Sequence, residues 1–395
     1  MRRLPLDGVV VVALEQAVAG PFATRQLADL GARVIKIERP KVGDFARDYD
    51  ETVNGMSSAF FWANRSKESL TLDLKHPDAA DVLARLLSRA DVLVQNLAPG
   101  AAERLGLGTD RLRSTHPRLV VCNISGYGPD GPYRDKKAYD LLIQGEAGII
   151  SLTGSPDEPA KVGTSIADIA GGMYAYSSVL GALFDRERSG EGSAIDVSLF
   201  DSLVEWMGYP LYYTEYGGTP PARMGTSHPT IAPYGAFRTR DGHEVLLAVQ
   251  SEREWRRFCS HVLRNEAAAE DERFRTMSAR VANRDALQKL VSDCLGSMET
   301  EEAVAMLEGA DIASAHLTPV TELADHPQLR ERGRWRDVDS PVGPVAALLP
   351  PAVPRGVEPR MDAVPALGAH TESVLGWLGY TSEETDQMRS KGLSA

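Results

Sequence analysis

A lone carboxylate and two adjacent glycines share the segment Ile166–Met173, which reads IADIAGGM. The pattern predicts that Asp168 begins a helix, where an aspartate often serves only as the N-cap. Gly171 and Gly172 follow in the same helix, and each costs up to about 1 kcal/mol relative to alanine. Such glycines usually mark the close approach of a ligand or of another backbone. A carboxylate at the positive helix end, beside open space, could attack an acyl group. Asp168 is therefore the first catalytic candidate, with capping as the alternative.

Several cationic or amide side chains follow predicted strands, close to the point where each strand ends. They are Arg39, Asn96, Arg104, Lys136 and Lys137. Ligands of open α/β sheets bind beyond the carboxyl ends of the strands. Cations that converge there on an acidic chain suggest a polyphosphate ligand, and a role in surface solubility is the alternative for each of them.

The elements that must position these residues alternate between strand-like and helix-like segments. The predicted strands are Val9–Leu14, Ala32–Glu38, Ser69–Leu74, Asp91–Leu97 and Arg118–Ser125. A continuous apolar run is typical of a strand that is buried on both faces. Strands separated by helices predict a parallel sheet with helices on both faces, so the first half is an α/β layer.

The second half of the chain has a different character. Long helices are predicted at Tyr139–Ile150 and Ile166–Arg186, followed by a strand at Ser193–Phe200. A hairpin around Asp241–Gly242 and further helices predict a smaller α+β domain. We therefore expect a large α/β domain over 1–205, a linker over 206–233, a small domain over 234–325 and a C-terminal segment over 326–395.

Composition excludes several classes of protein. The net charge of −12 argues against nucleic-acid or anionic-membrane binding, which calls for a basic face. The three cysteines lie far apart without a CxxC pair, which excludes a dense disulfide framework and a Cys-rich zinc site. No apolar stretch approaches the roughly 18 residues that span a bilayer. We expect a soluble cytoplasmic protein without a metal.

Common catalytic motifs are missing or interrupted. GxxxxGK[ST], HExxH and GxSxG do not occur, and the eight histidines have no metal-ligand spacing. The segment Gly126–Gly131 matches GxGxxG, but Pro129 and Pro132 interrupt the helix that a dinucleotide site needs. A rigid turn is the better interpretation of that segment.

The chain resembles the class III CoA-transferases, also called the CaiB/BaiF family. The resemblance runs along nearly the whole chain and is densest in Ala19–Gly20–Pro21, Leu27–Arg39 (LADLGARVIKIER), Asn64–Leu74 (NRSKESLTLDL), Gln95–Leu107 (QNLAPGAAERLGL), Gly126–Gly154 and Val162–Met173. It implies a Rossmann-like large domain, completed by the C-terminal segment, and a smaller α+β domain. It also implies a homodimer of interlocked chains.

The resemblance assigns roles to individual residues. Asp168 aligns with the catalytic aspartate. The residues implied in holding CoA are Val18, Arg39, Asn96, Arg104 and Lys137. Related transferases often carry a glutamine at the position of Val18, and Gln16 is the candidate substitute. Tyr139 and Asp140 are implied near the acyl site, and a structural hydrogen-bonding role is the alternative for Asp140. CoA and acyl-CoA are then substrates, and no permanently bound cofactor is expected.

The resemblance also implies a mechanism and an acceptor class. Asp168 would form an acyl-aspartyl anhydride and then an aspartyl-CoA thioester. Backbone N–H groups around Gly171–Gly172 or a neighbouring loop would stabilise the oxyanions. The segment Tyr133–Gly148 resembles the branch that uses small dicarboxylic acids, with Arg65, Arg134 or Arg223 as possible partners of a second carboxylate. The segment Gly225–Gly235 lacks the glycine-rich lid of some oxalate-using members, which counts against formyl-CoA:oxalate exchange.

Two alternatives to the transferase remain open. An α-methylacyl-CoA racemase of this fold needs a histidine and an aspartate as opposed acid/base groups. The histidine position is Tyr139 here, and a phenol with an ordinary pKa near 10 is a poor base near neutral pH. A CoA-binding protein without turnover would require Asp168 to be only a helix cap.

Overall fold

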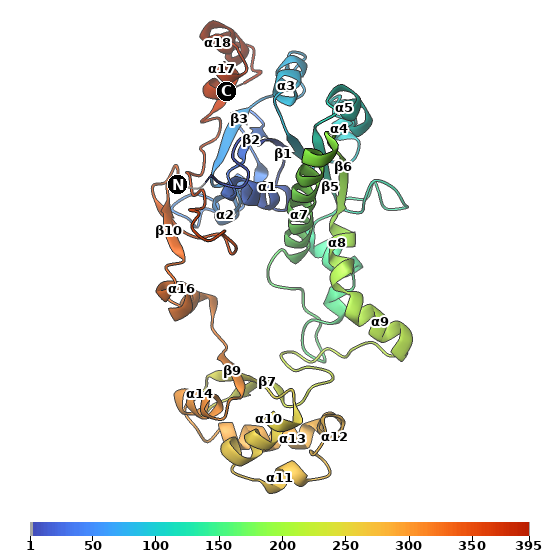
Figure 1. Cartoon of the computed structure of the whole chain (residues 1–395), viewed down its shortest axis with the longest axis vertical. Coiled ribbons are helices and arrows are strands. Elements are labelled where there is room, and N and C mark those ends of the chain that lie inside the picture. The colour runs from blue at the N-terminus through green and yellow to red at the C-terminus, as the bar shows by residue number, and fades with distance from the viewer. Residues whose placement is uncertain (1–2, 395) are drawn as a thin grey trace. The chain divides into compact units, whose positions relative to one another are not determined.

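The computed structural model describes residues 3–394, which divide into two compact units (Figure 1). The large unit takes its residues from Met1–Gly148, Val162–Gly208 and Arg330–Ala395. The small unit comprises Ile149–Lys161 and Tyr209–Leu329. The large unit is therefore assembled from three stretches of the chain.

A six-stranded parallel sheet in the order β3-β2-β1-β4-β5-β6 forms the centre of the large unit. Its strands are β1 (Val10–Leu14), β2 (Arg33–Glu38), β3 (Lys67–Thr71), β4 (Val92–Gln95), β5 (Val120–Ser125) and β6 (Ala194–Ser198). The expected α/β, Rossmann-like class is confirmed. The carboxyl ends of β1 and β4 are neighbours, so the segments that follow these two strands emerge side by side.

One predicted strand is misplaced by about two residues. The apolar pattern put it at Ser69–Leu74, whereas β3 runs from Lys67 to Thr71. The difference has a physical cause. Lys67 is charged but only 2% exposed, because its ammonium group is buried in an ion pair with Glu15 rather than in apolar contacts. A pattern of apolar residues therefore cannot identify such a lysine as part of a strand.

The helices of the large unit lie between and after these strands. They are α1 (Ala19–Asp29), the 3-10 helix η1 (Phe45–Asp48), α2 (Ser58–Asn64), α3 (Ala79–Leu87), α4 (Ala101–Arg104), α5 (Thr109–Thr115), α6 (Asp140–Glu146), α7 (Ile166–Ser189), α8 (Leu199–Trp206), α17 (Thr371–Trp377) and α18 (Ser382–Ser390). A two-stranded antiparallel sheet, β10 (Trp335–Val338) with β11 (Val345–Leu348), precedes α17.

The apolar core of the large unit includes residues from the end of the chain. Val12, Ile35 and Leu93 of the sheet belong to one buried cluster with Leu375 of α17 and Leu393. Alternate strand residues point to the opposite face of the sheet. On that face α1 and α7 pack against each other and against the strands. The C-terminal segment thus helps to build the large unit.

The two glycines of α7 allow close packing between helices. A Cβ atom at Gly172 would lie 2.8 Å from the carbonyl oxygen of Ala19 and 2.9 Å from Cδ1 of Phe22. A Cβ atom at Gly171 would collide with the side chain of Leu199. Both glycines are therefore explained by neighbouring helices, without any ligand.

The small unit has its own sheet and core. A three-stranded antiparallel sheet has the order β7-β8-β9, with β7 (Tyr234–Arg238), β8 (Glu244–Ala248) and β9 (Ala313–His316). Its helices are α9 (Gly208–Gly217), α10 (Glu252–Arg257), the π-helix η3 (Phe258–Val262), α11 (Ala267–Glu270), α12 (Met277–Ala282), α13 (Arg284–Leu295) and α14 (Thr300–Gly309). The 3-10 helix η2 (Ile149–Ser151) comes before them, and α15 (Val320–Leu323) and α16 (Pro327–Glu331) follow.

The expected boundaries differ from these units in three places, one of which is that residues 326–329, expected in the C-terminal segment, belong to the small unit. Residues 149–161, expected in the large domain, belong to the small unit because Arg223 donates hydrogen bonds to the carbonyl oxygens of Ser155 and Pro156. The expected linker over 206–233 contains helix α9. The contacts of Arg223 join segments far apart in the chain, so local sequence could not reveal them.

No helix within residues 3–394 is both long and apolar enough to cross a membrane. No group of three or more His, Cys, Asp or Glu residues in the same range is arranged to hold a metal ion.

Candidate active site

Asp168 lies in the first turn of α7 but is not its cap. The helix begins at Ile166 with Ser165 as the N-cap, so Asp168 is the third helical residue. The amide of Ala167 in the same turn donates to Oδ1 of Asp140 at 2.8 Å. Capping is therefore supplied by Asp140 from the start of α6, and the interpretation of Asp168 as an N-cap is wrong.

The carboxylate of Asp168 has no hydrogen-bond or ion-pair partner among the described residues, although the side chain is half-buried. Burial raises the pKa of Asp168 to about 7, and the nearby carboxylate of Asp140 contributes to the rise. A large part of this group is then protonated near neutral pH. An ionisable group that is perturbed in this way is a candidate for function.

Asp140 joins two helices. Besides its bond to Ala167, its Oδ2 accepts a hydrogen bond from Nε2 of Gln144 at 2.7 Å. The buried Gln144 in turn accepts a bond from the amide of Val162 at 2.8 Å. Both oxygens of Asp140 are thus engaged, and its influence on Asp168 is that of a fixed negative charge.

The start of α1 packs against α7, the helix that carries Asp168. Asp168 and Gly172 are four residues apart, so they lie on one face of α7. Gly172 packs on the first residue of α1, Ala19. Asp168 lies one turn nearer the start of α7, and the predicted site residues Gln16 and Val18 come just before Ala19 in the chain.

Side chains from two other loops hold the turn between β1 and α1. Asn96 exchanges two hydrogen bonds with the backbone of Gln16, one from Nδ2 to the carbonyl oxygen at 2.8 Å and one from the amide to Oδ1 at 2.9 Å. The next residue, Ala17, has a φ of 63°, and its amide donates to Oδ1 of Asp44 at 3.1 Å. Val18 is buried and forms the N-cap of α1. Asn96 thus contributes to the site by fixing the backbone of Gln16.

Tyr49 is a site residue that sequence reasoning missed. Burial raises its pKa, and the charges of Asp44, Asp168 and Tyr139 add to the rise. Its ring contacts that of Phe45 with 5.7 Å between centroids. Tyr49 is about half exposed and Tyr139 more so. The only available signal was that Tyr49 follows the β2 strand in the loop that begins with Arg39.

Three of the predicted CoA-binding cations are exposed and unpaired. Arg39 follows β2 directly, Arg104 ends α4, and Lys137 lies between β5 and α6. None of their side chains has a hydrogen bond or ion pair with another residue of the described range. The neighbouring Lys136 instead pairs with Glu146. Lys137 is therefore the better candidate for an external anion.

The three arginines considered for a second substrate carboxylate already have partners. Arg65 is 4% exposed and donates to both oxygens of Asp29, at 2.8 and 2.7 Å. Arg223 donates to backbone carbonyl oxygens, and Arg134 pairs with Asp135 on the surface. Arg65 is excluded as a substrate ligand by this geometry.

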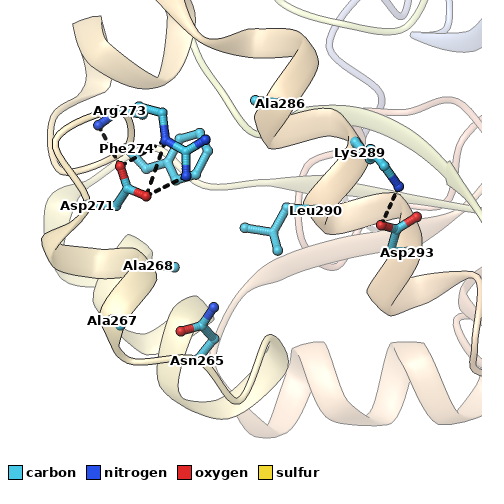
Figure 2. A pocket seen from close by; sticks show the side chains of 10 residues that line it. All are labelled: Asn265, Ala267, Ala268, Asp271, Arg273, Phe274, Ala286, Lys289, Leu290 and Asp293. Atoms are coloured by element: carbon cyan, nitrogen blue, oxygen red, sulfur yellow. Dashed lines mark hydrogen bonds and ion pairs between the residues drawn. The ribbon is translucent and has the colours of Figure 1, made fainter.

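A hollow of about 330 Å³ lies in the small unit (Figure 2). Arg273 pairs there with Asp271, and Lys289 pairs with Asp293, so its charged groups neutralise one another. None of the predicted site residues lines it. The hollow has no evident connection with the chemistry of Asp168.

Comparison with known proteins decides the family. Residues 6–371 match the family described as CoA-transferase family III. The chain belongs to this family. It is accordingly an enzyme of the transferase class, and enzymes of this class use CoA thioesters as substrates.

Individual relatives agree with this assignment. The chain is 35% identical over 387 residues to the succinate–glutarate CoA-transferase of Agrobacterium fabrum, covering 95% of this chain and 96% of the relative. It is 36% identical over 330 residues to the acetyl-CoA:oxalate CoA-transferase of Acetobacter aceti, covering 83% and 84%. The crystal structure of a CaiB/BaiF family protein from Brucella suis matches with a TM-score of 0.84 and 34% identity, covering 95% of this chain and all of that one.

Proposed function

We propose that this enzyme moves CoA from an acyl-CoA donor, such as succinyl-CoA, to a small dicarboxylic acid. The relatives that carry named activities act on succinate and glutarate or on oxalate, all of which are dicarboxylic acids. The observation that carries the proposal is the carboxylate of Asp168, which has no partner in the described structure and has a raised pKa. A carboxylate without partners keeps its lone pairs available for attack.

The reaction follows from what a carboxylate does to a thioester. Asp168 attacks the donor carbonyl carbon, the C–S bond breaks, and CoA leaves as a thiolate. The thiolate attacks the aspartyl carbonyl and expels the donor acid, leaving an aspartyl-CoA thioester. The acceptor carboxylate then attacks this thioester, and the released thiolate takes the acceptor acyl group and frees Asp168. Splitting the transfer in this way replaces one difficult step with several easier ones.

The oxyanions of these steps need hydrogen-bond donors. Gly171 and Gly172 are unsuitable, because both lie inside α7, where backbone N–H groups bond to the preceding turn. The amides of Val18, Ala19 and Gly20 at the start of α1 have no acceptor among the described residues. The helix that carries Asp168 packs on Ala19 through Gly172, and we assign the role to these amides.

CoA recognition belongs to the residues beyond the strand ends. Arg39, Arg104 and Lys137 supply positive charge for the phosphates of CoA. Asn96 contributes by fixing the backbone of Gln16. Tyr139 and Asp140 border the acyl group.

We also propose that the enzyme is a homodimer. None of the residues of α9 is buried, and the helix exposes Tyr209, Tyr212 and Tyr216. An apolar surface of this kind usually marks an interface. Light scattering across a range of protein concentrations tests this, and a monomer at every concentration would contradict it.

The test of function uses purified enzyme with succinyl-CoA and a pool of acids that contains glutarate, oxalate, mesaconate, itaconate and malate. The CoA esters are analysed by mass spectrometry, in deuterated water, beside an Asp168→Ala control. A new ester that disappears in the variant supports the transferase and identifies its acceptor. Deuterium at the α-carbon of an added 2-methylacyl-CoA, without a new ester, would support the racemase. Retained CoA binding with neither product would leave a binding protein.

A further inference from the structure

A cluster of buried ions lies beneath the turn between β1 and α1. Its members are Glu15, Lys36, Asp44 and Lys67, and each is at most 2% exposed. Nζ of Lys67 lies 2.7 Å from Oε1 of Glu15, and Nζ of Lys36 lies 2.8 Å from Oδ2 of Asp44. Burial lowers the pKa of Lys67 to about 7, and the cluster lies among other buried polar side chains, such as Asn64 and Glu38.

Every ion of the cluster has further partners. The ammonium group of Lys67 also donates to Oδ1 of Asn64 at 3.1 Å, and Thr24 donates to Oε2 of Glu15 at 2.7 Å. The amide of Asp44 donates to the carboxylate of Glu38 at 3.1 Å. The cluster is therefore fixed from several elements at once.

Stability alone does not explain these charges. Burying ions costs desolvation energy, and apolar residues of similar volume often stabilise a protein equally well or better. Buried ion pairs can instead be retained because they select one conformation, which is a hypothesis to be examined for each protein. The contacts of the cluster indicate which conformation is selected.

These contacts converge on one stretch of backbone. Lys36 donates to the carbonyl oxygen of Glu15 at 3.3 Å, Lys67 donates to that of Pro21 at 2.9 Å, and Asp44 accepts from the amide of Ala17. Ala17 has the positive φ of 63°, which residues with a Cβ atom rarely adopt. The cluster thus holds a strained residue that precedes the free amides at the start of α1.

We propose that Asp44 is a positioning residue for CoA transfer. Paired with Lys36, it fixes Ala17 in the left-handed conformation and so aims the amides of residues 18–20 at the carbonyl group that reacts with Asp168. This role rests on the proposed function. It predicts that a disturbed turn slows the chemical step while acyl-CoA still binds.

The test combines two single variants with their double variant. In Asp44→Asn the shape is kept, but an NH₂ group faces either Lys36 or the amide of Ala17, so one of these contacts is lost. We expect kcat to fall by about 10- to 100-fold, because a misplacement near 1 Å costs that much, with KM for acyl-CoA within about threefold. Ala17→Gly alone should keep kcat within about twofold of the parent enzyme.

Rescue separates positioning from a general loss of structure. Glycine adopts a positive φ without support, so Ala17→Gly added to Asp44→Asn should recover kcat by about tenfold. An Asp44→Asn enzyme with unchanged kcat, or one that Ala17→Gly does not rescue, would overturn the proposal. Thermal unfolding and calorimetric CoA binding, measured on each variant, report whether the fold is kept.

A second variant covers the case in which Asp44→Asn does not fold. Ala17→Val leaves the buried ions in place but puts a β-branched residue at a positive φ, so the turn must move. It should lose kcat as Asp44→Asn does, and normal kcat would overturn the proposal. The parent enzyme is assayed first. Absence of exchange with every acid would overturn the proposed function and this role together, whereas exchange that survives in the variants would overturn this role only.

Discussion

Two kinds of carboxylate flank the start of α1, and their surroundings affect them in opposite ways. Burial alone would raise the pKa of Glu15, but Lys67, Lys36 and the bond from Thr24 outweigh it, so the pKa of Glu15 is lowered. Asp168 has no such partners, and burial raises its pKa to about 7. Partners, rather than burial, decide which carboxylate is a permanent charge and which is reactive.

Lys136 and Lys137 differ in the same way, since one ammonium group has a partner and the other has none among the described residues. Lys136 pairs with Glu146 and lies over the ring of Tyr133, whereas Lys137 has no partner in the described range. In both pairs the charged group without a partner is the one that the resemblance assigns to function. Four measurements test whether the lack of a partner marks the functional group.

The largest expected effect is that of Asp168→Asn on the reaction. Removal of a nucleophile should lower kcat by about 10⁴-fold or more. The free energy of unfolding should not fall in this variant. A group whose pKa is raised on folding opposes folding once pH exceeds its ordinary value, so loss of this charge should increase the free energy of unfolding at pH 8. Exchange assays and urea unfolding measure the two effects, and a destabilised variant would contradict the contrast.

Glu15→Gln should behave in the opposite way. The neutral side chain leaves Lys67 and Lys36 with too little negative charge, and breaking a buried pair costs about 3–5 kcal/mol. Urea unfolding of this variant, beside the exposed pair variant Glu299→Gln, measures the loss. Equal stability of the two variants would show that the buried cluster has no special energetic role.

Lys137→Ala should raise KM for acyl-CoA by about tenfold, the usual loss for one hydrogen bond to a charged group. Lys136→Ala is the matched control, and its KM should change by less than about twofold, because its ammonium group is already occupied. The salt dependence of KM should weaken only in Lys137→Ala. An equal effect of both substitutions would break the analogy between the lysines and the carboxylates.

The smallest expected effect concerns pH. Ionised Asp168 is the attacking form, so kcat/KM should rise with pH through a pKa of about 7. Asp140→Asn keeps an oxygen that can accept from Ala167 but removes the negative charge beside Asp168. The rise should then move to lower pH. An unchanged dependence of kcat/KM on pH would mean that the charge of Asp140 does not affect the pKa of Asp168.

The sequence predicted the sheet well because buried parallel strands are apolar runs. The expected Ala32–Glu38 and the observed β2 (Arg33–Glu38) differ by one residue. It also predicted that Arg39 and Asn96 lie at the carboxyl ends of strands, which are β2 and β4 on either side of β1. The role of Asp44 was not predictable, because its contact with Ala17 depends on how a loop folds back across 27 positions. For the same reason the sequence did not indicate that Arg65 is occupied by Asp29.

The central claim is that Asp168 carries the CoA during transfer. The most direct measurement is the intact mass of the enzyme after incubation with succinyl-CoA alone, followed by peptide mapping. We expect a covalent adduct equal to CoA less one water on the peptide that contains Asp168, and we expect it to disappear when an acceptor acid is added. Full exchange activity with no adduct on that peptide under rapid quenching would contradict it.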